Sequence, residues 1–600
     1  MVCYIAASVA VTWPLPAQLW RGQLLKVADV SSYVWALWWV PHQLVHLGNP
    51  WFTQHMAAPV GIQLGFDTLM PLPGLIMAPV TLAFGPVASF AVLTIATPGL
   101  LCYVTYRAAR LWLRPPGAIA AGALFGLSTM VAWQNALHLN ISLGTIFLPL
   151  TLEAAVRLRR TPGRRQGIWI GVVLGASVLT NQESAVVAAL LAVAVLAPWL
   201  IMLIIRDPRR AAITPGLRTL ALGAVVAVVV ASPQLAAMIG QAASGGTTIA
   251  AANVQQLTES YRNFGVGLPT LFAPSPRLGH FGLGSLTAAY QFTDKAQRAE
   301  GIPTFGVVLA ALAVIGLALS WRRRAAWWLA LLWLAGAALA LGPTLVIGTR
   351  TFVPLATTWH GVIVSPLMPY TWLIRVPGLS ALREADRLAL LGLLGAAILA
   401  GLAIDWICGH HRKLLAGAVV VVIAAAAFLE AGYSANGYPQ MAAELPAVDG
   451  PIAADHSATI VVDIPYGLRG GVGVGGQPIP PEALVIATAD GHPRAESYSS
   501  WVPKATSKAI NRRPFYRFLD DAQTGARFPH DGPDQRAAAA SARRLRIGWI
   551  IVWHSVHLAG RASVISFLYG TDFKVDYQVH HGDTGITIWC ARWARACPGS

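Results

Sequence analysis

The sequence has very little charge. Only 12% of its 600 residues are Asp, Glu, Lys or Arg, whereas 55% are hydrophobic and the mean hydropathy is +0.56. A soluble chain of this length needs far more charge to cover its surface, so the composition predicts a polytopic membrane protein. The net charge of +17 is typical of some nucleic-acid-binding proteins. The arginines, however, occur in short clusters between apolar segments, which is the pattern of cytoplasmic loops, so we expect no nucleic-acid partner.

Cysteine is also scarce, and the five cysteines have no spacing typical of a metal site. Cys3, Cys102 and Cys408 fall in or beside apolar segments, where a small buried thiol is the simplest interpretation. Cys590 and Cys597 lie close together near the C-terminus. They can form a disulfide if that region is exported, because an oxidising compartment permits it.

Long apolar runs are abundant. Because a span needs roughly 20 apolar residues, we predict about eleven transmembrane helices. They lie near residues 2–19, 86–106, 116–133, 141–156, 167–182, 184–205, 217–240, 303–321, 325–342, 387–407 and 414–432. The first lacks a basic leader and a cleavage site, so we interpret it as a retained span. The run 69–84 is short and contains three prolines, which favours a re-entrant or interfacial segment.

Charge predicts the orientation of these spans. With eleven spans, all arginine clusters between them fall on one side of the membrane, and the positive-inside rule makes that side cytoplasmic. The N-terminus is then cytoplasmic and the C-terminal region extracytoplasmic. The sequence thus predicts a transmembrane domain over residues 1–432 and an exported domain over 433–600. The long outer loops of the transmembrane domain are 20–85, 241–302 and 343–386.

Hydropathy changes after Tyr433, where the pattern indicates a small α/β domain. Strands are expected at 458–465, 547–553, 572–581 and 585–590, and helices near 513–523, 535–545 and 558–569. The glycine-rich stretch 470–476 lacks the Lys-Ser/Thr ending of a phosphate-binding loop, so we expect a flexible loop. In the first outer loop, the Trp-rich run 31–47 resembles an amphipathic helix at the membrane interface.

Outward-facing carboxylates are few, which draws attention to Asp29, directly after the first predicted span. An acid near the membrane is costly and usually has a function or a partner. Asp29 can act as the N-cap of the helix that follows, a role shared with Ser31 and Ser32. It can also act as a general base that removes a proton from a sugar hydroxyl. One residue can do both.

Four further polar residues are candidates for sugar binding on the outer side: Asp67, His138, Asn140 and Glu183. Glu183 marks a tight turn between two predicted spans, where it can line a cavity or simply satisfy helix ends. His138 and Asn140 occupy a short outer loop and can bind sugar hydroxyls. A structural role for the histidine is the competing interpretation.

Three arginines concentrate positive charge on the predicted outer side, against the positive-inside rule. Arg375, Arg383 and Arg387 are candidates for binding the phosphate of a lipid, because guanidinium groups bind phosphate oxygens in a bidentate way. The alternative is internal pairing with Glu384 and Asp386.

Three blocks of sequence resemble the bacterial multi-spanning glycosyltransferases of the GT-C type. The blocks are Thr12–Phe52 with Asp29 and its tryptophans, Met77–Pro86, and Pro369–Arg383. The resemblance covers roughly residues 1–440. It implies a GT-C-like helical bundle in a bacterial plasma membrane, followed by the exported domain.

The resemblance also implies an activity. GT-C enzymes use an acidic residue of the first outer loop for catalysis and a polyprenyl-phosphate sugar as donor. Asp29 matches that acid, and the acceptor would be a lipid or a glycan of the cell envelope. The sequence departs from the paired acidic motif of many members, since Ala28 and Val30 flank the aspartate. A divalent cation is therefore left open, and no metal ligand is predicted.

Two other functions compete with a hexosyl- or pentosyltransferase. A carrier of lipid-linked substrates should have polar residues in mid-span or paired broken helices, whereas these spans are almost entirely Ala, Val, Leu and Gly. A non-catalytic envelope assembly or scaffold protein would keep the fold and use the exported domain to bind partners. The missing second acid leaves this alternative open.

Overall fold

The computed structural model describes residues 2–600 with several gaps. Residues outside the description are 207–214, 245–263, 275–303, 349, 360, 377–378, 380–381, 411–412, 431–438, 458, 471–472, 527, 529–531, 571–572, 582–583 and 598–600. Most of the predicted outer loop 241–302 therefore lies outside the described residues.

The chain divides into two compact units, each assembled from separate stretches of sequence. Unit 1 comprises Met1–Gln18, Ala91–Ser232 and Leu257–Gly437; unit 2 comprises Leu19–Phe90, Pro233–Gln256 and Tyr438–Ser600. The predicted domain boundary at 432/433 stays a prediction. By compactness, the segment 19–90 groups with the C-terminal region rather than with the helices that follow it.

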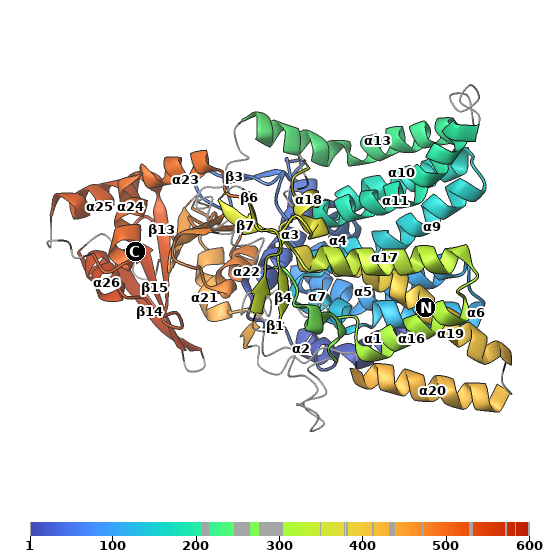
Figure 1. Cartoon of the computed structure of the whole chain (residues 1–600). Helices are drawn as coiled ribbons and strands as arrows, with labels where there is room; N and C mark the ends of the chain where they lie inside the picture. Colours follow the sequence, from blue (N-terminus) through green and yellow to red (C-terminus); the bar gives the residue numbers. More distant parts are fainter. Residues whose placement is uncertain are drawn as a thin grey trace. The chain divides into compact units, whose positions relative to one another are not determined.

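Unit 1 is helical, with small β-hairpins, and α16, α17, α19 and α20 run side by side in it (Figure 1). Its helices, of which α5 and α13 also extend into unit 2, are α1 (Val2–Thr12), α5 (Pro86–Ala109), α6 (Pro115–Gly126), α7 (Thr129–Leu137), α8 (Leu139–Thr145), α9 (Phe147–Arg160), α10 (Arg164–Val178), α11 (Gln182–Arg206), α13 (Pro215–Ala243), α16 (Val307–Leu319), α17 (Arg324–Ala340), α18 (Pro369–Leu373), α19 (Ala389–His410) and α20 (Lys413–Glu430).

Six described helical segments are long and apolar enough to cross a membrane. They are Pro86–Ala109, Leu139–Arg160, Gln182–Met202, Pro215–Ala243, Ala385–His410 and Lys413–Glu430, and the pair α6 and α7, bent by 44°, makes a seventh if it is one span. The protein is therefore a multi-pass membrane protein. The predicted count of eleven is higher because four predicted spans correspond to shorter helices: α1, α10, α16 and α17 are only 11, 15, 13 and 17 residues long.

Glycines allow the central helix α19 to approach its neighbours closely. A Cβ atom at Gly316 of α16 would lie 1.9 Å from the carbonyl oxygen of Leu399, and one at Gly336 of α17 would lie 2.2 Å from the amide nitrogen of Gly392. Small residues at such crossings are the usual means of packing helices in a membrane, where burial from water does not drive association. A methyl group at either position would push the helices apart.

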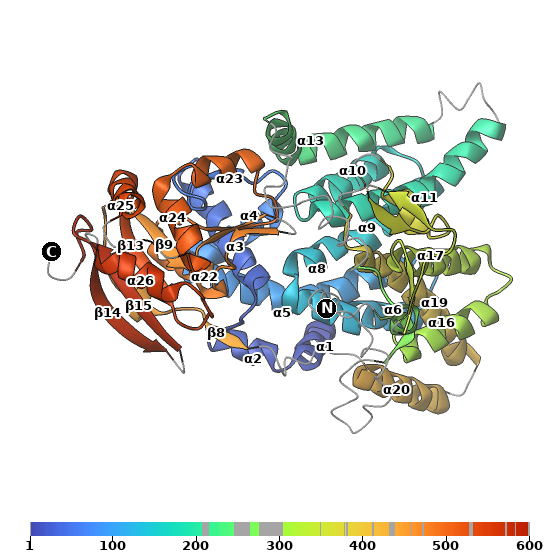
Figure 2. The same cartoon turned by 60° about the vertical axis from the view of Figure 1, so that its left-hand side comes forward.

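Unit 2 contains a four-stranded mixed sheet in the order β14-β15-β13-β9, with β9 and β13 parallel and the other pairs antiparallel. The strands are β9 (Ile460–Ile464), β13 (Ile547–Trp553), β14 (Phe573–His581) and β15 (Thr584–Ala591), and the helices beside them in Figure 2 are α24 (Pro514–Gln523), α25 (Pro533–Leu545) and α26 (Arg561–Tyr569). These elements confirm the strands and helices predicted for the C-terminal region.

Both faces of this sheet are buried. Along β13, Ile550 and Val552 pack in one apolar core with the helices, whereas Trp549 and Ile551 pack in a second core with α21 (Pro446–Ala453). Alternate side chains of a strand point to opposite faces, so a strand buried on both sides needs an unbroken apolar run. Cys590 of β15 forms a disulfide with Cys597, with a Cα–Cα distance of 5.7 Å.

The first outer loop folds into unit 2. Helix α3 (Ala28–Val45) packs against α4 (Pro71–Phe84) and α22 (Pro481–Asp490), and its Trp35 and Trp39 belong to the same apolar core as β9 and β13. We expected residues 31–47 to form an amphipathic helix at the membrane interface. The helix is present, but its tryptophans contact protein, so the expected interfacial position is wrong. The indole rings are covered by protein, because the C-terminal region supplies the apolar surface that we had assigned to lipid.

A second expectation is also corrected. The glycine-rich stretch is not a loop: β10 (Gly467–Gly470) and β11 (Gly473–Gly476) form an antiparallel hairpin, and β12 (Ser497–Ser499) adds a parallel strand. Glycine has low strand propensity, but pairing with two neighbours compensates for it. Gly467 also fits because a Cβ atom there would lie 2.0 Å from the carbonyl oxygen of Gln477.

Candidate active site

Asp29 lies in the first turn of α3, where the partial positive charge of the helix N-terminus favours a carboxylate. It is not the N-cap; that position is Val27, which provides no side-chain cap. The Asp29 side chain is 28% exposed. Its Oδ1 accepts a hydrogen bond from the Tyr498 hydroxyl at 3.0 Å and is 3.4 Å from Nη1 of Arg469. A partly exposed carboxylate is therefore held by a phenol and a guanidinium.

The small sheet β11-β10-β12 presents both partners of Asp29. Arg469 of β10 is directly opposite Tyr498 of β12 in the register of this parallel pair. Neighbouring side chains on one face of a sheet contact each other, and the Arg469 guanidinium lies 4.1 Å from the centre of the Tyr498 ring. This cation–π contact fixes the two donors relative to each other.

Asp67 contacts the residues that follow Tyr498. Its Oδ2 accepts a hydrogen bond from the Ser499 hydroxyl at 2.7 Å, and its Oδ1 accepts from the backbone amides of Ser500 at 3.0 Å and Thr68 at 2.8 Å. Only 8% of Asp67 is exposed. Asp67 thus anchors the end of β12, which positions Tyr498 beside Asp29.

A buried charged network supports the other end of β12. Arg494 is fully buried; it pairs with Asp490 and lies 3.7 Å from Asp463. Burial raises the pKa of Asp490 to about 6, although Arg494 opposes that shift. Burial, followed by the Asp463 carboxylate, raises the pKa of Glu496 well above its ordinary value.

This network is also linked to the first outer loop. The backbone amide of Ala57 donates to the carbonyl oxygen of Glu496 at 3.0 Å, and that of Ala58 donates to the carbonyl oxygen of Arg494 at 2.9 Å. The segment that leads into β12 is therefore paired, strand-like, with the segment 55–58. The buried network around Arg494 and the backbone hydrogen bonds to residues 55–58 together hold Tyr498 in a fixed place within unit 2.

In unit 1, Glu183 lies in the first turn of α11 and forms an ion pair with Arg387. Arg387 also lies 3.8 Å from Glu384, which in turn pairs with Arg383 at 3.0 Å. The structure therefore brings Glu183, Arg383 and Arg387 together. Arg383 keeps a buried Nη1 without a hydrogen-bond partner among the described residues.

The remaining candidates of unit 1 lie apart from this cluster or are enclosed. The Arg375 guanidinium is exposed and stacks on Trp372, 4.9 Å from the ring centre. His138 separates α7 from α8 and is 4% exposed, and Asn140 is 3% exposed. The Oδ1 of Asn140 has no hydrogen-bond partner within the part of the chain that the structure describes.

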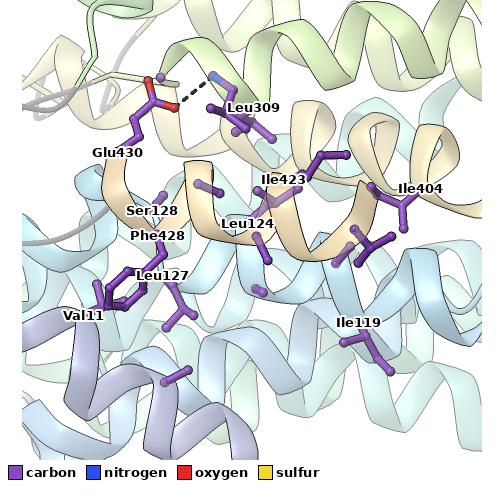
Figure 3. Close-up of a pocket in the computed structure, with 18 of the residues that line it drawn as sticks. Val11, Ile119, Leu124, Leu127, Ser128, Leu309, Ile404, Ile423, Phe428 and Glu430 are labelled. Atoms are coloured by element: carbon purple, nitrogen blue, oxygen red, sulfur yellow. Dashed lines mark hydrogen bonds between the residues drawn. The ribbon is translucent and has the colours of Figure 1, made fainter. Parts of the chain in front are cut away.

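Unit 1 also contains an apolar cavity of about 370 Å³, shown in Figure 3. Side chains of α1, α6, α16, α19 and α20 line it, among them Ile119, Leu309 and Ile423. Glu430 lies at one end, where its carboxylate accepts hydrogen bonds from the amides of Val307 and Val308 at 2.5 and 2.9 Å. The lining suits a hydrocarbon chain.

The groups around Asp29 do not fit a divalent cation. A guanidinium repels a cation, and a phenol that donates to the carboxylate is a poor ligand for Mg²⁺ or Ca²⁺, which prefer several oxygen ligands. Among the described residues, no group of three His, Cys, Asp or Glu side chains could hold a metal ion.

Sequence reasoning did not find Arg469 and Tyr498. Arg469 precedes the glycine-rich stretch that we expected to be a loop, and Tyr498 lies 469 residues after Asp29. A single sequence contains no signal for a contact over that separation. The period of alternation in 497–499 is also too short to indicate which side chain faces the first outer loop.

No protein-family model and no curated protein matches the chain. Solved structures do match it. The cryo-EM structure of the arabinofuranosyltransferase AftD from mycobacteria aligns with a TM-score of 0.57 at 14% identity, over 98% of this chain and 39% of AftD. A mutant form of AftD aligns with a TM-score of 0.59 at 14% identity, over 98% of this chain and 41% of its own. This chain thus spans about two fifths of the length of AftD.

The archaeal oligosaccharyltransferase AglB from Archaeoglobus fulgidus, in complex with an inhibitory peptide and a dolichol-phosphate, aligns with a TM-score of 0.44 at 12% identity. That alignment covers 95% of this chain and 70% of AglB. The fold assignment rests on AftD, for which the scores exceed 0.5. The fold of this chain is GT-C-like, as the sequence resemblance implied.

Proposed function

We propose that this protein is a membrane glycosyltransferase that moves a sugar from a polyprenyl-phosphate donor to a lipid or glycan of the cell envelope. The proposal rests on the Asp29 site. There, a partly exposed carboxylate lies at a helix N-terminus and contacts Tyr498 and Arg469. The GT-C-like fold supports it, since AftD is an arabinofuranosyltransferase. The proposal includes a cytoplasmic N-terminus and an extracytoplasmic C-terminal region. It reaches eleven spans by counting the shorter helices α1, α10, α16 and α17 as spans too.

In the proposed reaction, Asp29 acts as the general base. An acceptor hydroxyl attacks the anomeric carbon of the donor sugar while its proton passes to the Asp29 carboxylate. The new oxygen–carbon bond forms as the bond from the anomeric carbon to the phosphate oxygen breaks, and polyprenyl phosphate leaves with that electron pair. The anomeric configuration is inverted. Tyr498 and Arg469 orient the carboxylate toward the acceptor hydroxyl.

In unit 1, we propose that Arg383 contacts a phosphate oxygen of a lipid-linked substrate. Its Nη2 is paired with Glu384, whereas Nη1 is buried and has no partner among the described residues. Arg387 is already paired with Glu183, and Arg375 is stacked on Trp372, so we assign them supporting roles. The apolar cavity beneath α20 supports a lipid substrate, because it can accommodate hydrocarbon.

The decisive experiment compares Asp29→Asn with Asp67→Asn. Asparagine keeps the size of Asp29 but cannot accept the proton, so transfer should fall by roughly 10²–10⁴-fold while the thermal unfolding midpoint stays near that of the wild type. Asp67→Asn should instead lower the midpoint, because Asp67 accepts three hydrogen bonds that hold β12 and residues nearby. Normal turnover of Asp29→Asn would leave the scaffold alternative as the better interpretation.

A further inference from the structure

A second cavity of unit 1, about 420 Å³ in volume, lies where α9 ends and α17 begins. Three arginines line it: Arg159 and Arg160 from the last turn of α9, and Arg324 from the first residue of α17. In the part of the chain that the structure describes, no aspartate or glutamate lines it. The cavity is thus strongly basic on one side.

Among the described residues, no carboxylate pairs with these arginines. Glu153, on the same helix as two of them, pairs with Arg107 at 3.0 Å and Arg157 at 2.8 Å instead. Within the described ranges, Arg159, Arg160 and Arg324 form no ion pair. Clustered like charges in a concave site focus a positive potential, which attracts an anion.

The rest of the lining is apolar or aromatic. Trp112 and Trp328 flank the arginines, with the Arg160 guanidinium 5.9 Å from the centre of the Trp112 ring, and Val156 and Val195 provide aliphatic surface. Arg160 is also the last residue of the span Leu139–Arg160. Tryptophans and arginines at the ends of spans occupy the boundary between hydrocarbon and water.

We propose that this cavity, the basic pocket, binds the phosphodiester headgroup of an anionic membrane phospholipid. The three guanidinium groups would hold the phosphate oxygens, and the valines and tryptophans would contact the beginning of the acyl chains. Basic pockets between transmembrane helices bind headgroups of this kind. By the predicted orientation, the pocket faces the inner leaflet. The site is independent of the proposed transferase activity.

A soluble phosphate fits the lining less well than a lipid does. It would use the arginines but leave the partly exposed Trp112 and Trp328 in contact with water, whereas a phospholipid covers both kinds of surface. A zwitterionic lipid carries a compensating cation beside its phosphate, which the arginines would repel. The basic pocket should therefore prefer phosphatidylglycerol to phosphatidylcholine.

The experiment uses the full chain purified in a neutral detergent. Dioleoyl phosphatidylglycerol, dioleoyl phosphatidylcholine and glycerol phosphate are titrated separately, and bound lipid is measured by native mass spectrometry together with the thermal unfolding midpoint. Phosphatidylglycerol should bind the wild type and raise its midpoint. Arg160→Gln combined with Arg324→Gln should weaken that binding by about ten- to hundredfold, the usual effect of losing charged hydrogen bonds.

Arg323→Gln is the matched control, because Arg323 precedes α17 but does not line the pocket. It should retain full binding. If the double variant does not fold, lipid binding is measured for Arg159→Gln instead. Because the Arg159 side chain is exposed, this substitution should leave the fold intact. Equal binding of phosphatidylglycerol by wild type and pocket variants would overturn the proposal. Displacement of the lipid by equimolar glycerol phosphate would overturn it too, in favour of a soluble anion.

Discussion

At the scale of single residues, the hydroxyl of Tyr498 contacts Asp29 directly, at 3.0 Å from its Oδ1. It donates one hydrogen bond to a carboxylate, and hydrogen bonds to charged groups contribute about 1.5–3 kcal/mol. Tyr498→Phe removes this bond and leaves the ring beneath Arg469. If the bond orients the base, transfer should fall roughly tenfold or more, yet less than in Asp29→Asn. Initial rates of sugar transfer measure this.

Tyr466→Phe is the matched control for that substitution. Tyr466 is a buried tyrosine of the same unit, and its hydroxyl has no hydrogen-bond partner among the described residues. Its loss should leave both transfer and stability nearly unchanged. A similar fall in rate for the two variants would mean that aromatic hydroxyls act only through the fold.

His55 gives unit 2 a dependence on pH. Burial, with a smaller contribution from His42, lowers the pKa of His55 to about 4 from its ordinary 6.5. The folded ring therefore stays neutral where the unfolded chain gains a proton. The contribution of the neutral His55 ring to the free energy of unfolding is complete above about pH 6.5. It is lost as the pH falls toward 4, by at most about 1.4 kcal/mol per pH unit.

His55→Gln removes this dependence. As the pH falls from 6.5 to 4.5, the unfolding midpoint of the wild type should drop faster than that of the variant, and above pH 7 the difference should be constant. Asp490 acts in the opposite direction, because its pKa is raised, but it is present in both proteins and cancels. His46→Gln, at an exposed position, is the control. Parallel pH profiles for wild type and His55→Gln would contradict the assignment.

At the scale of elements, sequence patterns predicted the strands of the four-stranded sheet in unit 2 well. They predicted the contacts of the helix at 31–47 and the hairpin at 467–476 poorly. The run 547–553 is apolar at every position but one, and a strand buried on both faces demands this. By contrast, nothing in 31–47 distinguishes indoles that face lipid from indoles that face protein. The hairpin formed by β10 and β11 was not predicted, because the low strand propensity of glycine favours a loop. Hydrogen bonding between β10 and both β11 and β12 compensates for that low propensity.

The apolar cavity beneath α20 leads to a prediction about chain length. Ala424 lines the cavity, and tryptophan there would fill part of it. If a polyprenyl chain enters the cavity, excluding two methylene groups should cost about 1.6 kcal/mol, or roughly tenfold in KM for a long-chain donor. A donor with a short lipid should be unaffected.

Ala425→Trp is the control on the same helix, since Ala425 is exposed and does not line the cavity. The readout is KM measured with long-chain and short-chain donors for both variants. Equal KM values for Ala424→Trp and Ala425→Trp would show that the lipid chain lies elsewhere.

At the scale of the whole molecule, the orientation in the membrane stays a prediction that reporter fusions can test. Fusions after Arg165 and Arg324 should report the cytoplasm, because arginine clusters are retained on that side. Fusions after Gly450 should report the outside. A cytoplasmic signal after Gly450 would put Asp29 on the wrong face for a donor exposed on the outer side, and the basic pocket in the outer leaflet.

The hydrogen bonds that Asp29 and Asp67 accept from β12 and the residue after it have a consequence for biosynthesis. Asp29 leaves the ribosome 469 residues before Tyr498, which at about 5–20 residues per second is an interval on the order of 20–100 s. During that time, neither carboxylate has its partner from β12. Asp29 is therefore among the first parts of the protein to be synthesised, whereas its contacts with β12 are among the last to form. A nascent chain interrupted before residue 498 would insert its helices but carry an unfinished site.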